Sequence, residues 1–200
     1  MIELPTDLPA DLVPLAWLIG VWEGTGVIDY PVGENHLQGE FSHRVSFSHD
    51  GGPFLNYSGT ATFLGTDGSD SMPLIAETGF WRIARQATDA DAGPALLPPT
   101  APAVARTVDD VEALRTENGG FPLEVSLAHA DGALELYLGE IKGPRVDIAS
   151  DAIVRSATSK AHTASARMYG LVDGHMLWAW DIAALGTPLR SHASARLAKV

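Results

Sequence analysis

The chain has 200 residues, of which 46% are hydrophobic and 19% are charged, a composition typical of a globular domain rather than of a disordered chain. Its formal net charge of −12 and the lack of a basic stripe with interleaved aromatic residues argue against nucleic acid as a partner. The chain has no cysteine, which excludes disulfides and thiolate sites, and no apolar run reaches the roughly 18 residues of a membrane span.

The N-terminal segment predicts a cytoplasmic protein that begins with a short helix. MIELPTDLPADL is acidic and lacks the basic region followed by an apolar run that marks a signal peptide. Apolar residues then recur at helical spacing, and a proline within the pattern limits the predicted helix over residues 8–19 to one or two turns. The apolar residues are Leu8, Leu12, Leu15 and Ile19, and the proline is Pro14.

The next stretch, LIGVWEGTG, sets three glycines around a tryptophan in what otherwise reads as a strand. Glycine weakens a strand interior, so its repetition calls for a bend or for a close approach of another backbone. We expect a tightly coiled first strand of a closed barrel, with Trp22 filling the narrow end. A packing role is the main interpretation of Gly20, Trp22, Gly24 and Gly26, and a direct contact with a ligand is the alternative.

Beyond this strand the hydrophobic pattern has a period of two, which is typical of half-buried antiparallel strands. Apolar residues alternate with polar ones in FSHRVSFS (41–48), in LELYL (134–138) and in MLWAWDI (176–182). The pattern predicts about ten strands. Their predicted ranges are 20–30, 37–49, 54–65, 73–85, 121–129, 133–142, 145–156, 160–172, 175–184 and 188–199.

Turn residues between these runs indicate a meander. Asp-Gly pairs occur at 50–51, 67–68, 131–132 and 173–174, each between two predicted strands, and this pair suits the positive φ values of tight hairpins. About ten strands exceed the usual size of an open sheet, and closure removes the exposed edges. We therefore predict an all-β fold, a closed up-and-down antiparallel barrel with a short N-terminal plug helix.

One segment interrupts the strand pattern. Residues 86–118 are rich in alanine, proline and aspartate and show no alternation, so we expect a flexible insertion there. Within it, TVDDVEALRT is compatible with one or two helical turns.

Four sequence blocks occur in the order that they have in a known family. The GxWxGxG motif at 20–26 is followed by PFLNYS (53–58), PLIAETGFWR (73–82) and GTPLRSHASARL (186–197). Together they resemble the nitrobindins, haem-binding barrels of ten strands. The resemblance covers nearly the whole chain apart from the 86–118 segment, so we expect residues 1–200 to form one nitrobindin-like domain.

The resemblance implies a function and a cofactor. Nitrobindins carry one haem b per subunit, whose ferric form converts peroxynitrite to nitrate and which also binds nitric oxide. The expected partners are therefore these small molecules, with neither nucleic acid nor a membrane. The oligomeric state is left open, with a homodimer among the alternatives.

The same resemblance singles out residues for the haem site. Taken alone, none of the seven histidines stands out as a metal ligand, because histidine has many ordinary roles. His192 matches the axial histidine of the family in GTPLRSH, and Lys160 matches a lysine that contacts the haem. Arg82 and Arg167 are further candidates for the propionates, although each could instead pair with an acidic neighbour.

Three apolar residues match positions close to the haem. Leu74 and Ile75 fall where the family has distal-side residues, and Ile182 falls where some members have methionine. Ile75 departs from the pattern, because the family often has histidine there in its PLHxE block. The loss of this imidazole removes a possible distal donor and makes the expected pocket drier. Each of the three could also be ordinary barrel core.

A second function from another class is compatible with the same barrel. The protein could be a non-catalytic carrier of an apolar small molecule such as a fatty acid, with His192 as an ordinary residue at the mouth. Such a carrier usually needs a buried Arg–Tyr arrangement for the carboxylate, and no such arrangement is apparent in the sequence.

Overall fold

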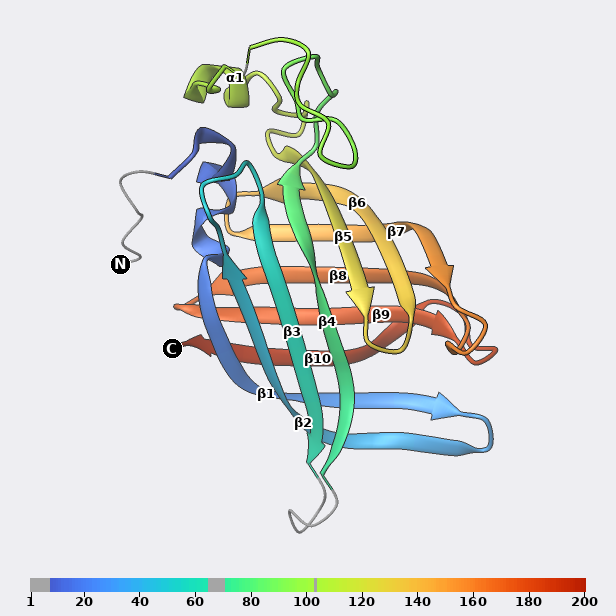
Figure 1. Ribbon diagram of the computed structural model, residues 1–200. Coiled ribbons are helices and arrows are strands. Elements are labelled where there is room, and N and C mark those ends of the chain that lie inside the picture. The colour runs from blue at the N-terminus through green and yellow to red at the C-terminus, as the bar shows by residue number, and fades with distance from the viewer. Residues whose placement is uncertain (1–7, 65–70, 103) are drawn as a thin grey trace.

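Ten antiparallel strands close into one barrel in the computed structural model, which describes residues 8–64, 71–102 and 104–200. Each strand pairs with its neighbour in the sequence, and the last strand returns to the first (Figure 1). The predicted fold class is confirmed. The strands are β1 (Gly20–Val32), β2 (Asn35–Ser48), β3 (Leu55–Leu64), β4 (Met72–Ile83), β5 (Phe121–His129), β6 (Ala133–Lys142), β7 (Arg145–Arg155), β8 (His162–Val172), β9 (His175–Ala184) and β10 (Arg190–Lys199).

The Asp-Gly pairs behave as turn residues where they can be seen. The pair at 131–132 joins β5 to β6, and the pair at 173–174 joins β8 to β9. Asp173 and Gly174 have φ values of 50° and 75°, as a tight hairpin requires. The pair at 50–51 lies in a longer connection between β2 and β3, and the pair at 67–68 lies outside the described residues.

A short helix plugs one end of the barrel, as predicted. This 3₁₀ helix, η1 (Ala10–Leu18), contains Pro14 and buries Leu12 and Leu15 completely. It joins directly to β1, where the indole Nε1 of Trp22 donates a hydrogen bond to the carbonyl oxygen of Leu18 at 2.7 Å. None of the described helices is long and apolar enough to cross a membrane.

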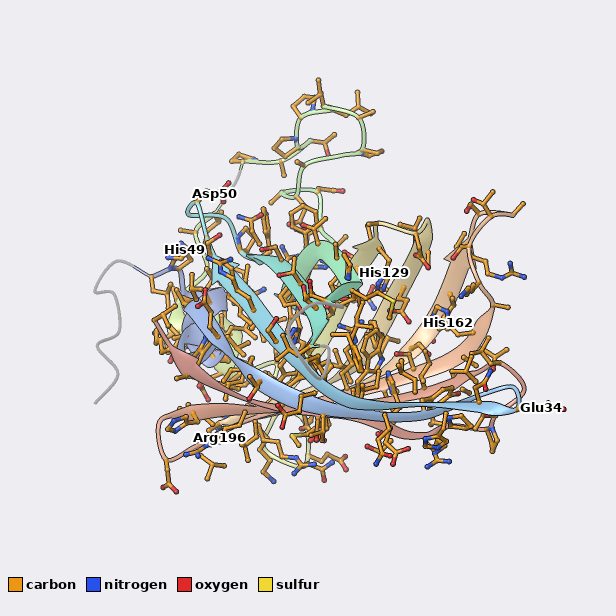
Figure 2. All side chains as sticks on the ribbon, turned by 90° about the horizontal axis from the view of Figure 1, so that it is seen from below. Glu34, His49, Asp50, His129, His162 and Arg196 are labelled. Carbon is orange, nitrogen blue, oxygen red and sulfur yellow. The ribbon has the colours of Figure 1, made fainter. Side chains whose placement is uncertain are left out.

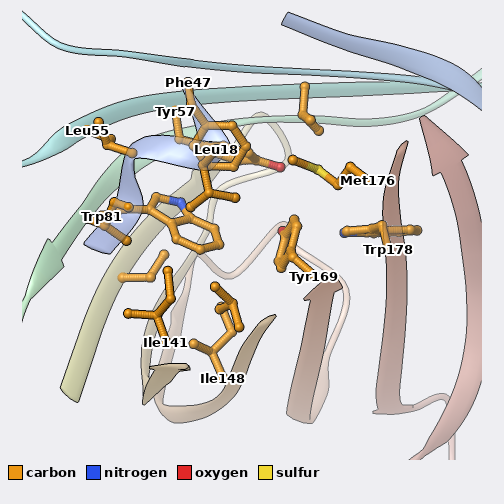
Figure 3. Packing of buried hydrophobic residues seen from close by; sticks show 14 of the residues in the cluster. Leu18, Phe47, Leu55, Tyr57, Trp81, Ile141, Ile148, Tyr169, Met176 and Trp178 are labelled. Atoms are coloured by element: carbon orange, nitrogen blue, oxygen red, sulfur yellow. The ribbon is translucent and has the colours of Figure 1, made fainter. Parts of the chain in front are cut away.

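Aromatic side chains fill the barrel interior next to η1, and we call this part the packed end. Trp81 is fully buried, and its ring lies 5.1–5.7 Å from the rings of Phe47, Tyr57 and Tyr169 (Figure 3). Such edge-to-face and tilted pairs add stabilisation to the burial of large apolar surfaces.

The glycines of β1 allow the first and last strands to approach closely. A Cβ atom on Gly24 would lie 2.2 Å from the carbonyl oxygen of Arg196, and one on Gly26 would lie 2.3 Å from that of Ser194. Both neighbours belong to the backbone of β10, which cannot move without breaking the barrel. Gly20 has a φ of 127°, a conformation that favours glycine. These contacts are what a packing role requires.

The leucines of β6 lie on the outside of the barrel. Leu134 and Leu138 are 52% and 43% exposed, whereas the side chains of Glu135 and Tyr137 are buried inside. The alternation therefore predicts the strand but not the direction in which each side chain points.

The 86–118 segment lies over the end that η1 plugs (Figure 1). Its one helix among the described residues, α1 (Val108–Glu112), confirms the predicted helical turn and begins with a capping box between Thr107 and Asp110. Val111 is buried, and Arg106 forms an ion pair with Asp11 of η1 at 2.9 Å.

Candidate functional site

The barrel interior opens into a cavity of about 540 Å³ at the end opposite η1. Its walls come from most of the strands and are mainly apolar and aromatic. We call this part the open end. All five of the predicted haem-site residues line this cavity: Leu74, Ile75, Lys160, Ile182 and His192.

A break in strand pairing directs His192 inward. In the pairing of β10 with β9, Ser191 lies opposite Asp181 and Ala193 lies opposite Trp180, so His192 is an extra residue with no partner. Such a bulge re-aims a side chain. The imidazole packs against two aromatic rings, with its centroid 5.2 Å from that of Trp180 and 5.5 Å from that of Tyr30.

His192 is a neutral imidazole at physiological pH. Burial lowers the pKa of His192 to about 4, and the nearby charge of Arg167 acts in the same direction. The backbone of Trp180 opposes this shift in part, but Nδ1 is buried and has no hydrogen-bond partner among the described residues. A neutral imidazole in an apolar cavity is the form that binds haem iron. The residues present therefore fit a haem.

The other predicted residues surround this imidazole with different chemistry. Leu74 and Ile75 come from β4 and Ile182 comes from β9, and all three offer only apolar side chains. Lys160 precedes β8 and is the only lysine or arginine among the described residues that line the cavity. An ammonium group at this place can pair with a carboxylate of a bound ligand.

Below the cavity lies a buried polar network that the sequence pattern does not predict. The Nη1 and Nη2 groups of Arg167 donate to the two carboxylate oxygens of Glu77 at 2.7 and 2.8 Å, and Nε donates to the hydroxyl oxygen of Tyr137 at 3.0 Å. Tyr57 donates to Glu77 at 2.7 Å, and Tyr137 donates to Glu135 at 2.7 Å. Arg167 and Glu135 also contact each other at 3.4 Å.

Two histidines connect this network to the cavity. The Nε2 atoms of His129 and His162 lie 2.6 and 2.8 Å from different oxygens of Glu135. The Nδ1 atom of His129 lies 3.5 Å from a carboxylate oxygen of Glu77. Both imidazoles line the cavity, whereas the two carboxylates do not (Figure 2 labels both histidines).

Trp180 lies between the network and His192. The guanidinium carbon of Arg167 is 4.0 Å from the centroid of the indole. The ring of His129 stacks on the same indole with an interplanar angle of 19°. The indole Nε1 donates to the hydroxyl oxygen of Ser165 at 2.6 Å. These contacts fix the aromatic ring against which His192 packs.

Both carboxylates of the network are ionised. Burial alone would raise the pKa of Glu77, but the charge and the hydrogen bonds of Arg167 outweigh it and leave that pKa below its usual value. Burial acts in the same way on Glu135, and the hydrogen bonds of His129 and His162 together with Arg167 hold its pKa well below the usual range.

Comparisons with known proteins identify the family. The model of the THAP4-like, heme-binding beta-barrel domain matches residues 11–199. The chain belongs to this family. It is 58% identical to a protein named peroxynitrite isomerase from Leifsonia xyli subsp. xyli, over 100% of this chain and 99% of that protein. It is 56% identical to one of the same name from Clavibacter michiganensis subsp. michiganensis, over the full length of both. The solved structure of Rv2717c from M. tuberculosis has a TM-score of 0.65 at 25% identity and covers 99% of both chains.

Other predicted residues of this THAP4-like barrel do not reach the cavity. Arg82 points outward and pairs with Glu124 at 2.7 Å, and Arg167 pairs with Glu77 in the buried network. Neither is among the described residues that line the cavity, so of the two alternatives for these arginines the structure shows the pairing with an acidic neighbour. The GxWxGxG residues at 20–26 also lie outside the cavity lining.

The network also corrects the argument about a fatty-acid carrier. A buried Arg–Tyr pair does exist, between Arg167 and Tyr137, although none is apparent in the sequence. Neither residue of this pair lines the cavity. The guanidinium of Arg167 is already bound by the carboxylates of Glu77 and Glu135. A fatty-acid carboxylate would have to displace a carboxylate of the protein itself.

Proposed function

We propose that the chain is a haem-dependent peroxynitrite isomerase that carries one haem b per subunit, with His192 as the axial ligand of the iron. The observation that carries this proposal is the neutral, half-buried imidazole of His192, which a strand bulge aims into an apolar cavity. The names of the relatives, at 56–58% identity over the full chain, support the activity.

Each cavity residue has a distinct part in this proposal. When bound, ferric haem supplies the Lewis-acid and redox chemistry that turns peroxynitrite into nitrate. His192 would bind the iron, and Lys160 would pair with a propionate. Leu74, Ile75 and Ile182 pack against the ligand and exclude water, which keeps a reactive species in a confined space.

Nitric oxide is a second small ligand that we propose for the haem-loaded protein. The resemblance to the nitrobindins suggests it, and an apolar cavity suits an uncharged diatomic molecule. A shift of the haem absorption on addition of nitric oxide would test this point separately from the isomerase activity.

A titration with ferric haem tests the axial ligand. Wild-type protein should give a saturable one-to-one complex with the Soret absorption of a histidine-ligated haem, and the His192→Ala variant should lose that spectrum. His175→Ala is the matched control, because His175 lies in the hairpin between β8 and β9 and outside the cavity lining. This variant should bind haem like the wild type. Equal haem binding by the wild type and His192→Ala would refute the assignment and favour a carrier of apolar molecules.

We also infer how the chain is organised and where it acts. The described strands belong to one barrel, which supports one domain over residues 1–200. That the 86–118 segment is a flexible insertion stays a prediction. A cytoplasmic location is part of this proposal. The partner that this function requires is a small anion, peroxynitrite. The function requires neither nucleic acid nor a membrane.

A further inference from the structure

The imidazole of His192 is oriented by packing rather than by a hydrogen bond. A histidine that binds a metal usually donates the N–H of its second ring nitrogen to an oxygen atom, which fixes the orientation of the ring. The Nδ1 atom of His192 is buried, and it has no hydrogen-bond partner among the described residues. The orientation of this ring therefore depends on Tyr30 and Trp180, whose ring centroids lie 5.5 and 5.2 Å from its own.

These two aromatic neighbours differ in their relation to the cavity. Trp180 lines the cavity, and its indole is fixed by the contacts with Arg167 and Ser165. Tyr30 is only 4% exposed, and it is not among the described residues that line the cavity. A ligand in the cavity therefore meets His192 and Trp180, whereas Tyr30 can act on that ligand only through His192.

Tyr30 lies where the first strand separates from the last one. β1 pairs with β10 only as far as Ile28, opposite Ala193, whereas its pairing with β2 continues to Val32. The separation begins directly at the bulged residue His192. Beyond Ile28, the β1–β2 hairpin therefore extends past β10 without pairing with it (Figure 1).

The hydroxyl group of Tyr30 bridges this gap. It donates a hydrogen bond to the carbonyl oxygen of Ala184 at 2.9 Å and accepts one from the amide N–H of the same residue at 3.1 Å. The pairing of β9 with β10 reaches only Ile182, so Ala184 lies beyond it. The hydroxyl group thus satisfies backbone groups that a neighbouring strand would otherwise bind. Within the described part of the chain, it is the one side chain that hydrogen-bonds from the hairpin beyond Ile28 to β9 or β10.

We propose that Tyr30 is a positioning residue for the haem ligand. Its hydroxyl group fastens the β1–β2 hairpin to the end of β9, and its ring thereby holds the imidazole of His192 against Trp180. A ring that is already fixed loses little conformational freedom when it binds the iron, which favours affinity. The role toward haem rests on the proposed function, whereas the fixed orientation of His192 in the haem-free chain does not.

Tyr30→Phe removes the hydroxyl group and keeps the ring, so the haem-free chain tests the orientation. The amide proton of Ala184 should exchange with solvent about tenfold faster, and the ring signals of His192 should broaden in nuclear magnetic resonance spectra. Thr163→Val is the matched control, because it removes a hydroxyl–backbone hydrogen bond to Ala183 at 3.3 Å and lies outside the cavity lining. It should leave the His192 signals unchanged. Unchanged exchange and unchanged His192 signals in Tyr30→Phe would overturn the proposal.

The haem-loaded chain tests the consequence for the ligand. With a haem-free globin in excess as the acceptor, Tyr30→Phe should lose haem about threefold to tenfold faster than the wild type or Thr163→Val. The iron–histidine stretching band of the reduced protein should broaden in resonance Raman spectra, because a loose imidazole samples several orientations. A loss of stability alone would not change this band.

The two measurements separate the positioning role from the proposed function. The same rate of haem loss and the same band in Tyr30→Phe and in the wild type would refute the positioning role even if haem binds as proposed. A wild-type chain that binds no haem, together with a loosened His192 in haem-free Tyr30→Phe, would refute the proposed function and leave the orientation by Tyr30 confirmed.

Discussion

The two ends of the barrel are built from the same ten strands but hold different contents. At the packed end, η1 and the rings around Trp81 fill the interior with apolar side chains. At the open end, a cavity of about 540 Å³ is left, and its floor is a network of buried charges rather than hydrocarbon. The difference indicates that the packed end stabilises the fold, and that the open end gives up some stability to hold a ligand.

A substitution at the boundary between the two ends should cause the largest loss of stability. Arg167→Met would leave Glu77 and Glu135 buried without their cation and should lower the free energy of unfolding by about 3–5 kcal/mol. Arg82→Met removes an Arg–Glu pair from the exposed surface, so it should cost less than about 1 kcal/mol. Urea denaturation of both variants measures the contrast. Similar losses for the two variants would mean that the network does not stabilise the boundary.

Leucine-to-alanine substitutions compare the two ends with the same chemistry. Leu55 is fully buried at the packed end, and Leu55→Ala should cost about 3 kcal/mol because it creates a cavity. Leu74 already faces the cavity, so Leu74→Ala should cost only about 1 kcal/mol. Haem affinity should show the reverse order, with a loss only for Leu74→Ala. Denaturation and Soret titration of both variants measure the two orders. Equal losses of stability would contradict the assignment of Leu55 to a packed end and of Leu74 to an open end.

The smallest effect concerns the pH dependence of the haem-free protein. The pKa of His192 is about 4 in the folded chain and about 6.5 when unfolded, so the unfolded state binds more protons between these values. Stability should therefore fall as the pH drops from 6.5 to 4, by about 2 kcal/mol after allowance for partial exposure. His192→Gln should remove this part of the decline. Parallel stability curves for the wild type and the variant would contradict the burial of a neutral imidazole.

The strands could be predicted because their signal is local. Alternation and Asp-Gly pairs depend on neighbouring residues, and they located all ten strands close to their observed bounds. The direction in which a side chain points depends on contacts with distant parts of the chain. In β6 the leucines face outward and Glu135 faces inward, because Glu135 meets His129, His162 and Arg167 there.

The candidate site also contains residues that could be predicted from the sequence and residues that could not. His192 and Lys160 could be named because they lie in short blocks that resemble a family, although the bulge that aims His192 inward leaves no pattern in the sequence. The network could not be named, because Arg167 and Glu77 are 90 positions apart and meet only when the barrel closes. Charged residues at inward positions of strands were the available signal, and it becomes readable only once the register of each strand is known.

The decay of peroxynitrite in the presence of the haem-loaded protein tests the central claim most directly. The decay rate should rise in proportion to the concentration of haem-loaded wild-type protein, nitrate should be the product, and His192→Ala should lose the acceleration. Decay no faster than with the haem-free chain, or a product other than nitrate, would contradict it.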